Sequence, residues 1–312
     1  MMPPNEVAEG IYLIDAEMYS IPRFTSVYLV ADEKIALIES GPSTSAEAIL
    51  DGIRQQGVDP QNIAYIVVTH IHLDHAGGAG TLIKHMPQAQ VLVHEKGAKH
   101  LVDPSKLMES VKQTWGEDGM QEQGSMLPIE AQRVHHVNDG DVLELGRRRK
   151  LTMIHAPGHA PHEICIYDSK SRGLFTGDAA GIYFPKEEVL VPTTPPPGFD
   201  LDIAIATIKK LMEIPTDLLL FSHFGVTRKV RETLVLAIES LEKWGKIVWE
   251  AMAEGDFNSV VGKLREQASL DMAGALGNAA LCEYMINSFV PLCATGYMNH
   301  YQKKSGRTNY RL

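Results

Sequence analysis

The sequence predicts an α/β layer fold that continues into a helical C-terminal region. Apolar, β-branched runs alternate with amphipathic stretches over the first two thirds of the chain, as is typical of α/β layer folds. From Thr227 onward the spacing of apolar residues becomes almost wholly helical. A chain of 312 residues is long enough for one large domain with an extension. We therefore predict an α/β domain over residues 1–226 and a helical extension over residues 227–312.

The individual elements follow from the spacing of apolar residues and from the turn residues between them. Residues 32–34 resemble the turn of a hairpin, and Gly41-Pro42 ends the third strand. Strand patterns occupy residues 10–14, 26–30, 35–38, 63–68, 90–94, 134–145 (with a turn at 138–141) and 151–154. Helical patterns occupy residues 43–57, 80–85, 200–213, 230–248, 257–264 and 279–301, the last interrupted at Pro291.

One stretch, directly after the apolar run of residues 63–68, carries the strongest chemical signal. Four potential metal ligands fall within six positions there, namely His70, His72, Asp74 and His75. A buried strand that runs into a polar loop presents such residues at its C-terminal end, where open α/β sheets carry their chemistry. Imidazole and carboxylate together suit zinc, iron or manganese better than calcium or magnesium. His-x-His sends two imidazoles to one side, whereas the adjacent Asp and His point apart, so the stretch can serve two metals.

Composition and charge exclude several other classes of protein. A net charge of −10 and a pI near 5.7 disfavour a surface that follows nucleic-acid phosphates, and the basic run 147–150 is expected to decorate a turn. The three cysteines form no Cys-x-x-Cys pair and favour a reducing, cytoplasmic setting, with Cys165 in the core. Residues 1–6 lack the features of a signal peptide, and no apolar run reaches transmembrane length. We expect no nucleic-acid partner and no membrane partner.

Three further motifs follow in order, each at the end of an apolar strand pattern. They are Pro157-Gly158-His159, Thr176-Gly177-Asp178 and Ser222-His223. Together with His-x-His-x-Asp-His they resemble the signature of the metallo-β-lactamase superfamily, and the similarity spans about residues 10 to 225. The resemblance implies a four-layer αββα sandwich, whose second sheet would be formed by the strands from residue 134 onward.

The resemblance also implies a ligand set for two divalent metal ions. Zinc is the first expectation, with iron and manganese as alternatives. Asp74 would also orient the attacking water and pass a proton to the leaving group, which makes it the catalytic candidate. His155 matches no family position, and His162 is either a hydrogen-bond partner of a ligand or a structural histidine. The implied ligands are His70, His72 and His159 for the first metal, Asp74, His75 and His223 for the second, and Asp178 as the bridge.

The implied activity is that of a dinuclear metal-dependent hydrolase, in which a metal-bridging hydroxide attacks a small ester, thioester or lactone. The glyoxalase-II-like branch matches the motifs best, but the basic C-terminal cluster with which that branch binds glutathione is not evident. Two alternatives stay open. A mononuclear iron persulfide dioxygenase has ligands that overlap with His70, His159 and Asp178. A ligand-binding or regulatory protein can be built on the same scaffold.

Two regions have no single interpretation from the sequence. Residues 192–197 contain four prolines and form either a rigid surface connector or a stiff wall of the active site. The apolar and aromatic residues of the C-terminal helices fit core packing, a wall of the pocket or a homodimer interface. The expected partner of the site is a small-molecule substrate.

Overall fold

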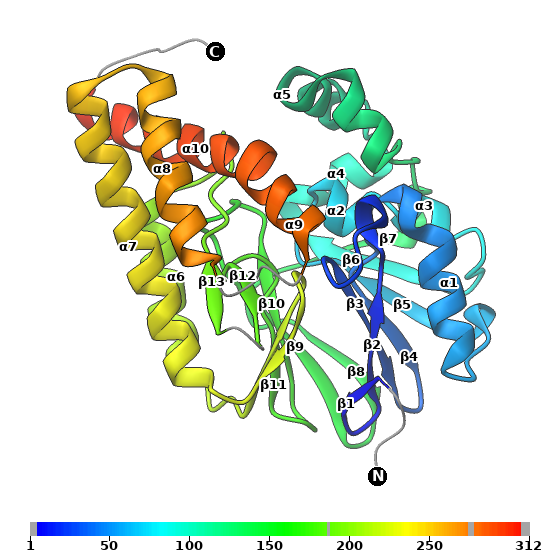
Figure 1. The fold of residues 1–312 in the computed structure, drawn as a ribbon. Helices are drawn as coiled ribbons and strands as arrows, with labels where there is room; N and C mark the ends of the chain where they lie inside the picture. The colour runs from blue at the N-terminus through cyan, green and yellow to red at the C-terminus, as the bar shows by residue number, and fades with distance from the viewer. Residues whose placement is uncertain (1–4, 186–187, 274–277, 307–312) are drawn as a thin grey trace. The chain divides into compact units, whose positions relative to one another are not determined.

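The computed structural model describes residues 5–185, 188–273 and 278–306 (Figure 1). The chain divides into two compact units, each assembled from several segments. The first unit contains residues 1–155, 162–177 and 216–228, and the second contains residues 156–161, 178–215 and 229–312. These units are defined by how compactly their residues pack, not by whether they fold separately. The predicted boundary after residue 226 was a boundary between two domains, and it stays a prediction.

The first unit contains a seven-stranded mixed sheet in which β1 to β7 lie in chain order. Neighbouring strands are antiparallel from β1 to β4 and parallel from β4 to β7. The parallel part is rich in buried valine and isoleucine, because helices and a second sheet exclude water from its two faces. The strands are β1 (Glu6–Ala8), β2 (Ile11–Asp15), β3 (Ser26–Ala31), β4 (Ile35–Ile38), β5 (Ile63–Val67), β6 (Gln90–His94) and β7 (Val134–Val137).

A six-stranded sheet, in the order β15-β14-β11-β10-β9-β8, also belongs to the first unit. The strands are β8 (Val142–Gly146), β9 (Arg149–His155), β10 (Ile164–Asp168), β11 (Gly173–Phe175), β14 (Leu218–Phe221) and β15 (Gly225–Thr227). The prediction that the second sheet begins at residue 134 is wrong for β7, which pairs with β6 in the first sheet. The turn at residues 138–141 therefore carries the chain from one sheet to the other, and strand patterning alone does not indicate such a change.

Three layers of the first unit share two apolar cores. Residues of both sheets, among them Tyr28, Val67 and Phe175, form one buried cluster. Helices pack their apolar sides against the other face of the first sheet, where α1 buries Ile49 and Ile53 (Figure 1). These helices are α1 (Ala46–Gln55), α2 (Leu73–Ala76), α3 (Ala79–Leu82) and α4 (Glu95–Val102), and α5 (Ser105–Gln123) contacts α4. Short 3₁₀ turns cover Met18–Ser20, Ser43–Ser45, Pro60–Asn62 and Ala131–Arg133.

The second unit is mainly helical, and α7, α8 and α10 lie side by side in it (Figure 1). The last helix was predicted to be interrupted or kinked at Pro291. Pro291 lies in the first turn of α10, directly after a π-helical segment, so the regular α-helical bonding changes there while the chain stays helical. Its elements are the hairpin β12 (Ile182–Phe184) and β13 (Val189–Val191), and the helices α6 (Leu201–Met212), α7 (Val230–Glu254), α8 (Phe257–Asp271), α9 (Ala279–Tyr284), the π-helical Met285–Phe289 and α10 (Val290–Ser305).

The basic run 147–150 decorates a turn only in part. Three of its residues are exposed, but Arg149 is completely buried. Its Nε donates to Oδ1 of Asp168 at 3.1 Å, and its Nη1 donates to the carbonyl of Ala31 at 2.9 Å. Arg149 opens β9, where the two-residue side-chain period turns it inward with Leu151 and Met153. The expectation of a purely exposed run is therefore wrong for this residue.

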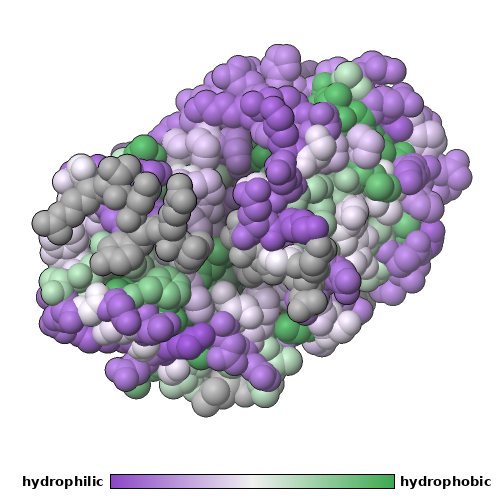
Figure 2. Space-filling view, turned by 90° about the horizontal axis from the view of Figure 1, so that it is seen from above, coloured by the Kyte–Doolittle hydropathy of each residue, from purple (hydrophilic) through white to green (hydrophobic). Residues whose placement is uncertain are grey.

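On the face drawn in Figure 2, hydrophilic residues predominate and hydrophobic residues occupy separate smaller areas. Within the described ranges, no helix is both long enough and apolar enough to span a lipid bilayer.

Candidate metal centre

Five of the seven predicted metal ligands belong to the first unit and follow the ends of its strands. β5 ends at Val67, and the loop and short helix α2 beyond it carry the four clustered ligands of residues 70–75. β14 ends at Phe221, two residues before His223. Strands that end at the same edge of a layered fold bring such loops together, as the sequence predicted.

The carboxylate of Asp74 lies next to two imidazoles. Its Oδ2 is 3.6 Å from Nε2 of His75 and 3.3 Å from Nε2 of His223. One ligand atom from each of the three residues lies within 4.8 Å of the other two. Both histidines are buried, whereas 24% of the Asp74 side chain is exposed. The three donor atoms converge, and the group can be reached by solvent at Asp74. This arrangement matches the requirement of a catalytic metal, which needs protein ligands and one open position.

The neighbouring histidines also determine the charge of Asp74. Burial opposes ionisation of this carboxyl group, but His75, His223 and His72 outweigh burial and hold the pKa of Asp74 well below its usual range. The attraction to His75 and the hydrogen bond to His223 lead these favourable effects. The carboxyl group of Asp74 is therefore ionised at neutral pH, and in this form both of its oxygens can accept hydrogen bonds or bind a metal.

His70 and His72 form a second close pair of donors in the first unit. Nε2 of His70 is 2.9 Å from Nδ1 of His72, and the ring centres of His70 and His75 are 4.0 Å apart. Two imidazole nitrogens at 2.9 Å must share a proton or a cation, because two lone pairs at this distance repel each other. The pair therefore fits a metal ion by the chemistry of its donors.

A fully buried carboxylate, Glu39, supports this group from the end of β4. Its Oε1 accepts hydrogen bonds from Nδ1 of His75 at 2.9 Å and from the hydroxyls of Thr69 and Ser222 at 2.6 and 2.8 Å. Since the carboxylate accepts, His75 carries its proton on Nδ1 and directs Nε2 toward Asp74. Glu39 is not among the predicted site residues. The available signal was an acidic residue at the end of an otherwise apolar strand pattern.

His223 is oriented in the same manner by the backbone. Its Nδ1 lies 3.3 Å from the carbonyl oxygen of Phe24, which can only accept, so Nδ1 carries the proton and Nε2 faces Asp74. The Phe24 ring also packs against the imidazole, with ring centres 5.4 Å apart. The loop between β2 and β3 thus fixes a predicted ligand that follows it by about 200 residues.

The glycine pair after the ligand cluster serves a close backbone contact. The amide of Gly78 donates to the carbonyl of Gly41 at 2.7 Å. A Cβ atom on Gly78 would lie 2.3 Å from the carbonyl oxygen of Ser40, which is too close for any side chain. Glycine at this position therefore lets the ligand loop pack against the segment after β4.

The two histidines that the sequence left without a ligand role occupy different places. The ring of His162 is 6.1 Å from His70 and 5.9 Å from His72, so it lies beside that pair. His155 instead stacks on His94, with ring centres 4.4 Å apart.

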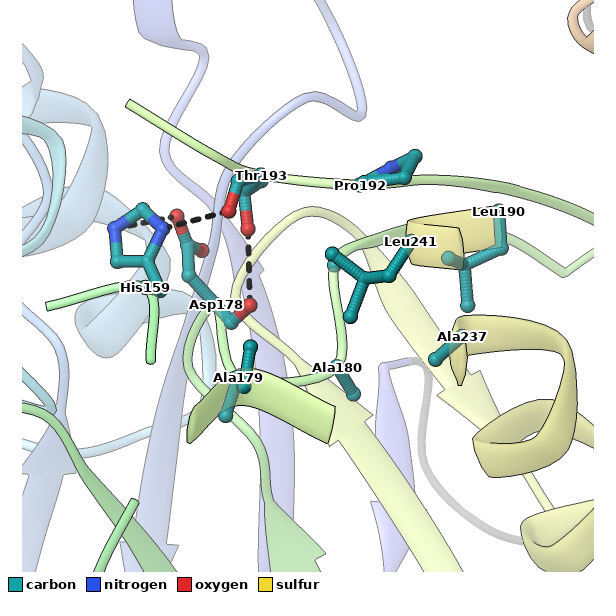
Figure 3. Close-up of a pocket in the computed structure, with 11 residues that line it drawn as sticks. His159, Asp178, Ala179, Ala180, Leu190, Pro192, Thr193, Ala237 and Leu241 are labelled. Atoms are coloured by element: carbon teal, nitrogen blue, oxygen red, sulfur yellow. Dashed lines mark hydrogen bonds and ion pairs between the residues drawn. The ribbon is translucent and has the colours of Figure 1, made fainter. Parts of the chain in front are cut away.

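The second unit holds the remaining two predicted ligands, His159 and Asp178 (Figure 3). Nε2 of His159 is 3.4 Å from Oδ2 of Asp178, and both side chains are at least 95% buried. Nδ1 of His159 donates to the carbonyl of Thr193 at 3.1 Å, and the hydroxyl of Thr193 donates to the carbonyl of Asp178 at 2.9 Å. One nitrogen and one oxygen donor thus face each other, and a neighbouring segment holds both.

The Pro-Gly-His turn that presents His159 is anchored on α6. Gly158 has a φ of 142°, and a Cβ atom there would lie 2.4 Å from Cα of Ala204. The carbonyl of Gly158 accepts from the amide of Asp200, and the carbonyl of Pro157 accepts from the hydroxyl of Thr207. This glycine is thus required by the close approach of the turn to the helix.

A cavity of about 10 Å³, enough for one water molecule, lies beside His159 and Asp178 (Figure 3). Small and aliphatic residues from the helices and hairpin form most of its wall, together with Pro192 and Thr193 of the Pro-rich segment. Residues 192–194 are buried. The interpretation of the Pro-rich segment as a surface connector is therefore wrong for these residues.

Comparison with known proteins gives the chain its family. Residues 20–223 match the model of the metallo-beta-lactamase superfamily. The chain is 30% identical over 273 residues to the metallo-beta-lactamase fold-containing protein ST1585 of Sulfurisphaera tokodaii, across 85% of this chain and 95% of that protein. The crystal structure of ST1585 aligns with a TM-score of 0.62 over 75% of this chain and 86% of that one.

Two other proteins show similarity of different kinds. The structure of TTHA1429 from Thermus thermophilus aligns with a TM-score of 0.70 at 17% identity, covers 96% of this chain and 95% of that one, and shares the fold. The acyl-coenzyme A thioesterase MBLAC2 of Homo sapiens is 26% identical over 188 residues, which cover 56% of this chain and 64% of that protein. The predicted fold class is confirmed, and the glyoxalase-II-like branch stays a prediction. The chain belongs to the metallo-β-lactamase superfamily of metal-dependent hydrolases.

Proposed function

We propose that this protein is a dinuclear metal-dependent hydrolase that cleaves a small ester, thioester or lactone, with thioesters as the first class to test. The convergence of Asp74, His75 and His223 within 4.8 Å, with Glu39 fixing one imidazole from behind, is the observation that supports this most directly. The residues form a donor set that divalent metals prefer, and the carboxylate is ionised at neutral pH.

Seven side chains would hold the two ions. Zinc is the first choice because imidazole and carboxylate suit it, and iron and manganese accept the same donors. Two such ions supply an activated water at neutral pH and polarise a substrate carbonyl. The ligands in this proposal are His70, His72, Asp74, His75, His159, Asp178 and His223.

Asp74 has the catalytic role in this proposal. Its carboxylate is ionised, lies 3.3 Å from His223 and is the most exposed member of its group. It can therefore accept a hydrogen bond from the attacking water and orient it. It can also carry the proton from that water to the leaving group, which then departs as a neutral thiol or alcohol rather than as an anion.

The thioester preference is supported by a relative. MBLAC2 is an acyl-coenzyme A thioesterase by name, and its similarity covers more than half of this chain. Since no basic C-terminal cluster is evident in the sequence, we do not extend the proposal to glutathione thioesters.

We further propose that the enzyme works on a small molecule in the cytoplasm, without nucleic acid or membrane. The net charge of −10 supports the exclusion of nucleic acid, because a negatively charged chain repels phosphate backbones. Three free cysteines support a reducing compartment.

The test combines metal analysis with a substrate panel. Protein purified without added metal should contain close to two divalent ions per chain and hydrolyse a member of a thioester, ester and lactone panel. Asp74→Asn should lower kcat by about 10²- to 10⁴-fold. Asp51→Asn, an exposed carboxylate that pairs with Arg54 on α1, is the matched control and should keep its rate.

The other outcomes point to the alternatives. One iron per chain together with oxygen consumption on a persulfide would favour the mononuclear dioxygenase. Full metal content without turnover on any panel member would favour a ligand-binding protein, as would a biological effect that survives Asp74→Asn.

A further inference from the structure

We propose that Thr193 is a positioning residue for two metal ligands, and that helix α10 holds the Pro-rich segment 192–197 in place for this purpose. The inference rests on the proposed function, since it assigns His159 and Asp178 to a metal centre. It gives the Pro-rich segment and the C-terminal helix a shared role that the motifs of the superfamily do not include.

Thr193 contacts both ligands at once (Figure 3). Its carbonyl oxygen accepts from Nδ1 of His159 at 3.1 Å, and its hydroxyl donates to the backbone carbonyl of Asp178 at 2.9 Å. A carbonyl oxygen can only accept, so this contact places the imidazole proton on Nδ1 and leaves Nε2 as the ligand nitrogen. That nitrogen faces Oδ2 of Asp178 at 3.4 Å.

Helix α10 holds the residues on both sides of Thr193. The hydroxyl of Thr194 donates to the carbonyl of Cys293 at 3.1 Å, and the thiol of Cys293 donates to the carbonyl of Pro192 at 3.6 Å. All four residues are buried, so water does not compete for these bonds. Thr193 is therefore fixed through its two neighbours by one turn of α10.

Gly296 permits this contact. It lies one turn beyond Cys293 on α10, and a Cβ atom at this position would lie 1.7 Å from the carbonyl oxygen of Thr194. The neighbouring atom belongs to the backbone, so a larger residue must displace the segment itself rather than a flexible side chain. Prolines restrict the backbone of the segment, so it transmits such a displacement instead of absorbing it locally.

The first experiment measures metal affinity in Thr193→Val and Thr193→Ser. Valine keeps the shape and removes the hydroxyl, whereas serine keeps the hydroxyl. We expect Thr193→Val to bind zinc about 10- to 100-fold more weakly in competition with a chromophoric chelator. Thr193→Ser should recover most of that affinity. The absorption spectrum of the cobalt(II)-loaded protein should change in the valine variant, because the surroundings of one bound ion are altered.

The second experiment uses a pair of helical glycines. Gly296→Ala should weaken zinc binding by a similar factor, because the added methyl group displaces Thr194. Gly262→Ala on α8 is the matched control, since a Cβ atom there meets nothing within 4 Å. It should leave zinc affinity and the cobalt spectrum unchanged. Melting temperatures of the metal-free proteins confirm that each variant is folded.

The results separate this inference from the function on which it rests. If the wild-type protein binds no divalent metal, the proposed function fails. If the wild-type protein binds metal and both Thr193→Val and Gly296→Ala match it in affinity and spectrum, the positioning role is overturned and the hydrolase proposal stands. If Thr193→Val does not fold, equal affinities of Gly296→Ala and Gly262→Ala still overturn the positioning role.

Discussion

At the scale of single residues, Arg149 is a charged side chain whose role is to stabilise the fold. Arg149 and Asp168 are both completely buried and paired at 3.1 Å. Removal of one partner leaves an uncompensated buried charge, so we expect Arg149→Ala to lower the free energy of unfolding by about 3–5 kcal/mol. Urea unfolding, followed by circular dichroism, measures this change in the free energy of unfolding. Arg148→Ala, the exposed neighbour, should stay within about 0.5 kcal/mol of wild type. Equal losses in both variants would contradict the assignment.

The cysteines give a prediction about reactivity. Burial raises the pKa of the Cys293 thiol to about 12, and only the thiolate reacts with alkylating reagents. Because a raised pKa keeps the group protonated below that value, Cys293 should remain unlabelled by iodoacetamide at pH 8 in the native protein. Cys282 is only partly buried and should react first, as peptide mapping would show. Rapid labelling of Cys293 before unfolding would contradict its buried position.

Residue spacing indicates candidate metal ligands better than it indicates the residues that support them. The predicted ligands stand in short motifs after apolar strands, so their chemistry is visible along the chain. Glu39 is 36 residues from His75, and Thr193 is 34 residues from His159 and 15 residues from Asp178. Glu39 acts through its carboxylate, and Thr193 acts through its backbone carbonyl and its hydroxyl, which are groups that many strand ends and loops carry without such a role. Only the folded backbone distinguishes them.

At the scale of elements, helix α7 carries one buried tryptophan, Trp244, and one exposed tryptophan, Trp249. Trp244 is completely buried and its Nε1 donates to Asp271 at 3.0 Å, whereas Trp249 is 54% exposed. We expect Trp244→Ala to lower the free energy of unfolding by about 3–5 kcal/mol through the cavity it leaves. Trp249→Ala should cost less than about 1 kcal/mol. Similar urea midpoints for the two variants would show that this face of α7 is not part of the core.

Elements with long periodic patterns were predictable, and short ones were not. The strands β2 to β7 and the helices α1, α6 and α7 follow from their apolar spacing. The three-residue strands β12 and β13 carry too few residues to show a period of two. The helix α5 has little amphipathic character, so the apolar spacing of residues 105–123 does not define its bounds. The change of sheet after β7 depends on pairing partners far apart in the chain, which no local pattern encodes.

At the scale of the whole molecule, metal binding and folding are coupled in the proposed centre. The proposed ligands follow three strands and one helix-docked turn, so in this proposal they would bind metal together only once these elements have folded. A metal that binds the folded chain and not the unfolded one stabilises it by about 2.7 kcal/mol at a hundred times its dissociation constant. The same coupling makes metal content a measure of the correct fold.

Removal of the metal should therefore lower thermal stability as well as activity. We expect dialysis against a chelator to reduce the melting temperature by roughly 5–10 °C, and added zinc to restore it in a concentration-dependent manner. Differential scanning fluorimetry measures both changes. His75→Ala, which removes a ligand that Glu39 orients, should show a smaller response to the chelator because its metal-loaded state is already weakened. If neither the chelator nor added zinc changes the melting temperature, the converging donors hold no metal in the folded protein.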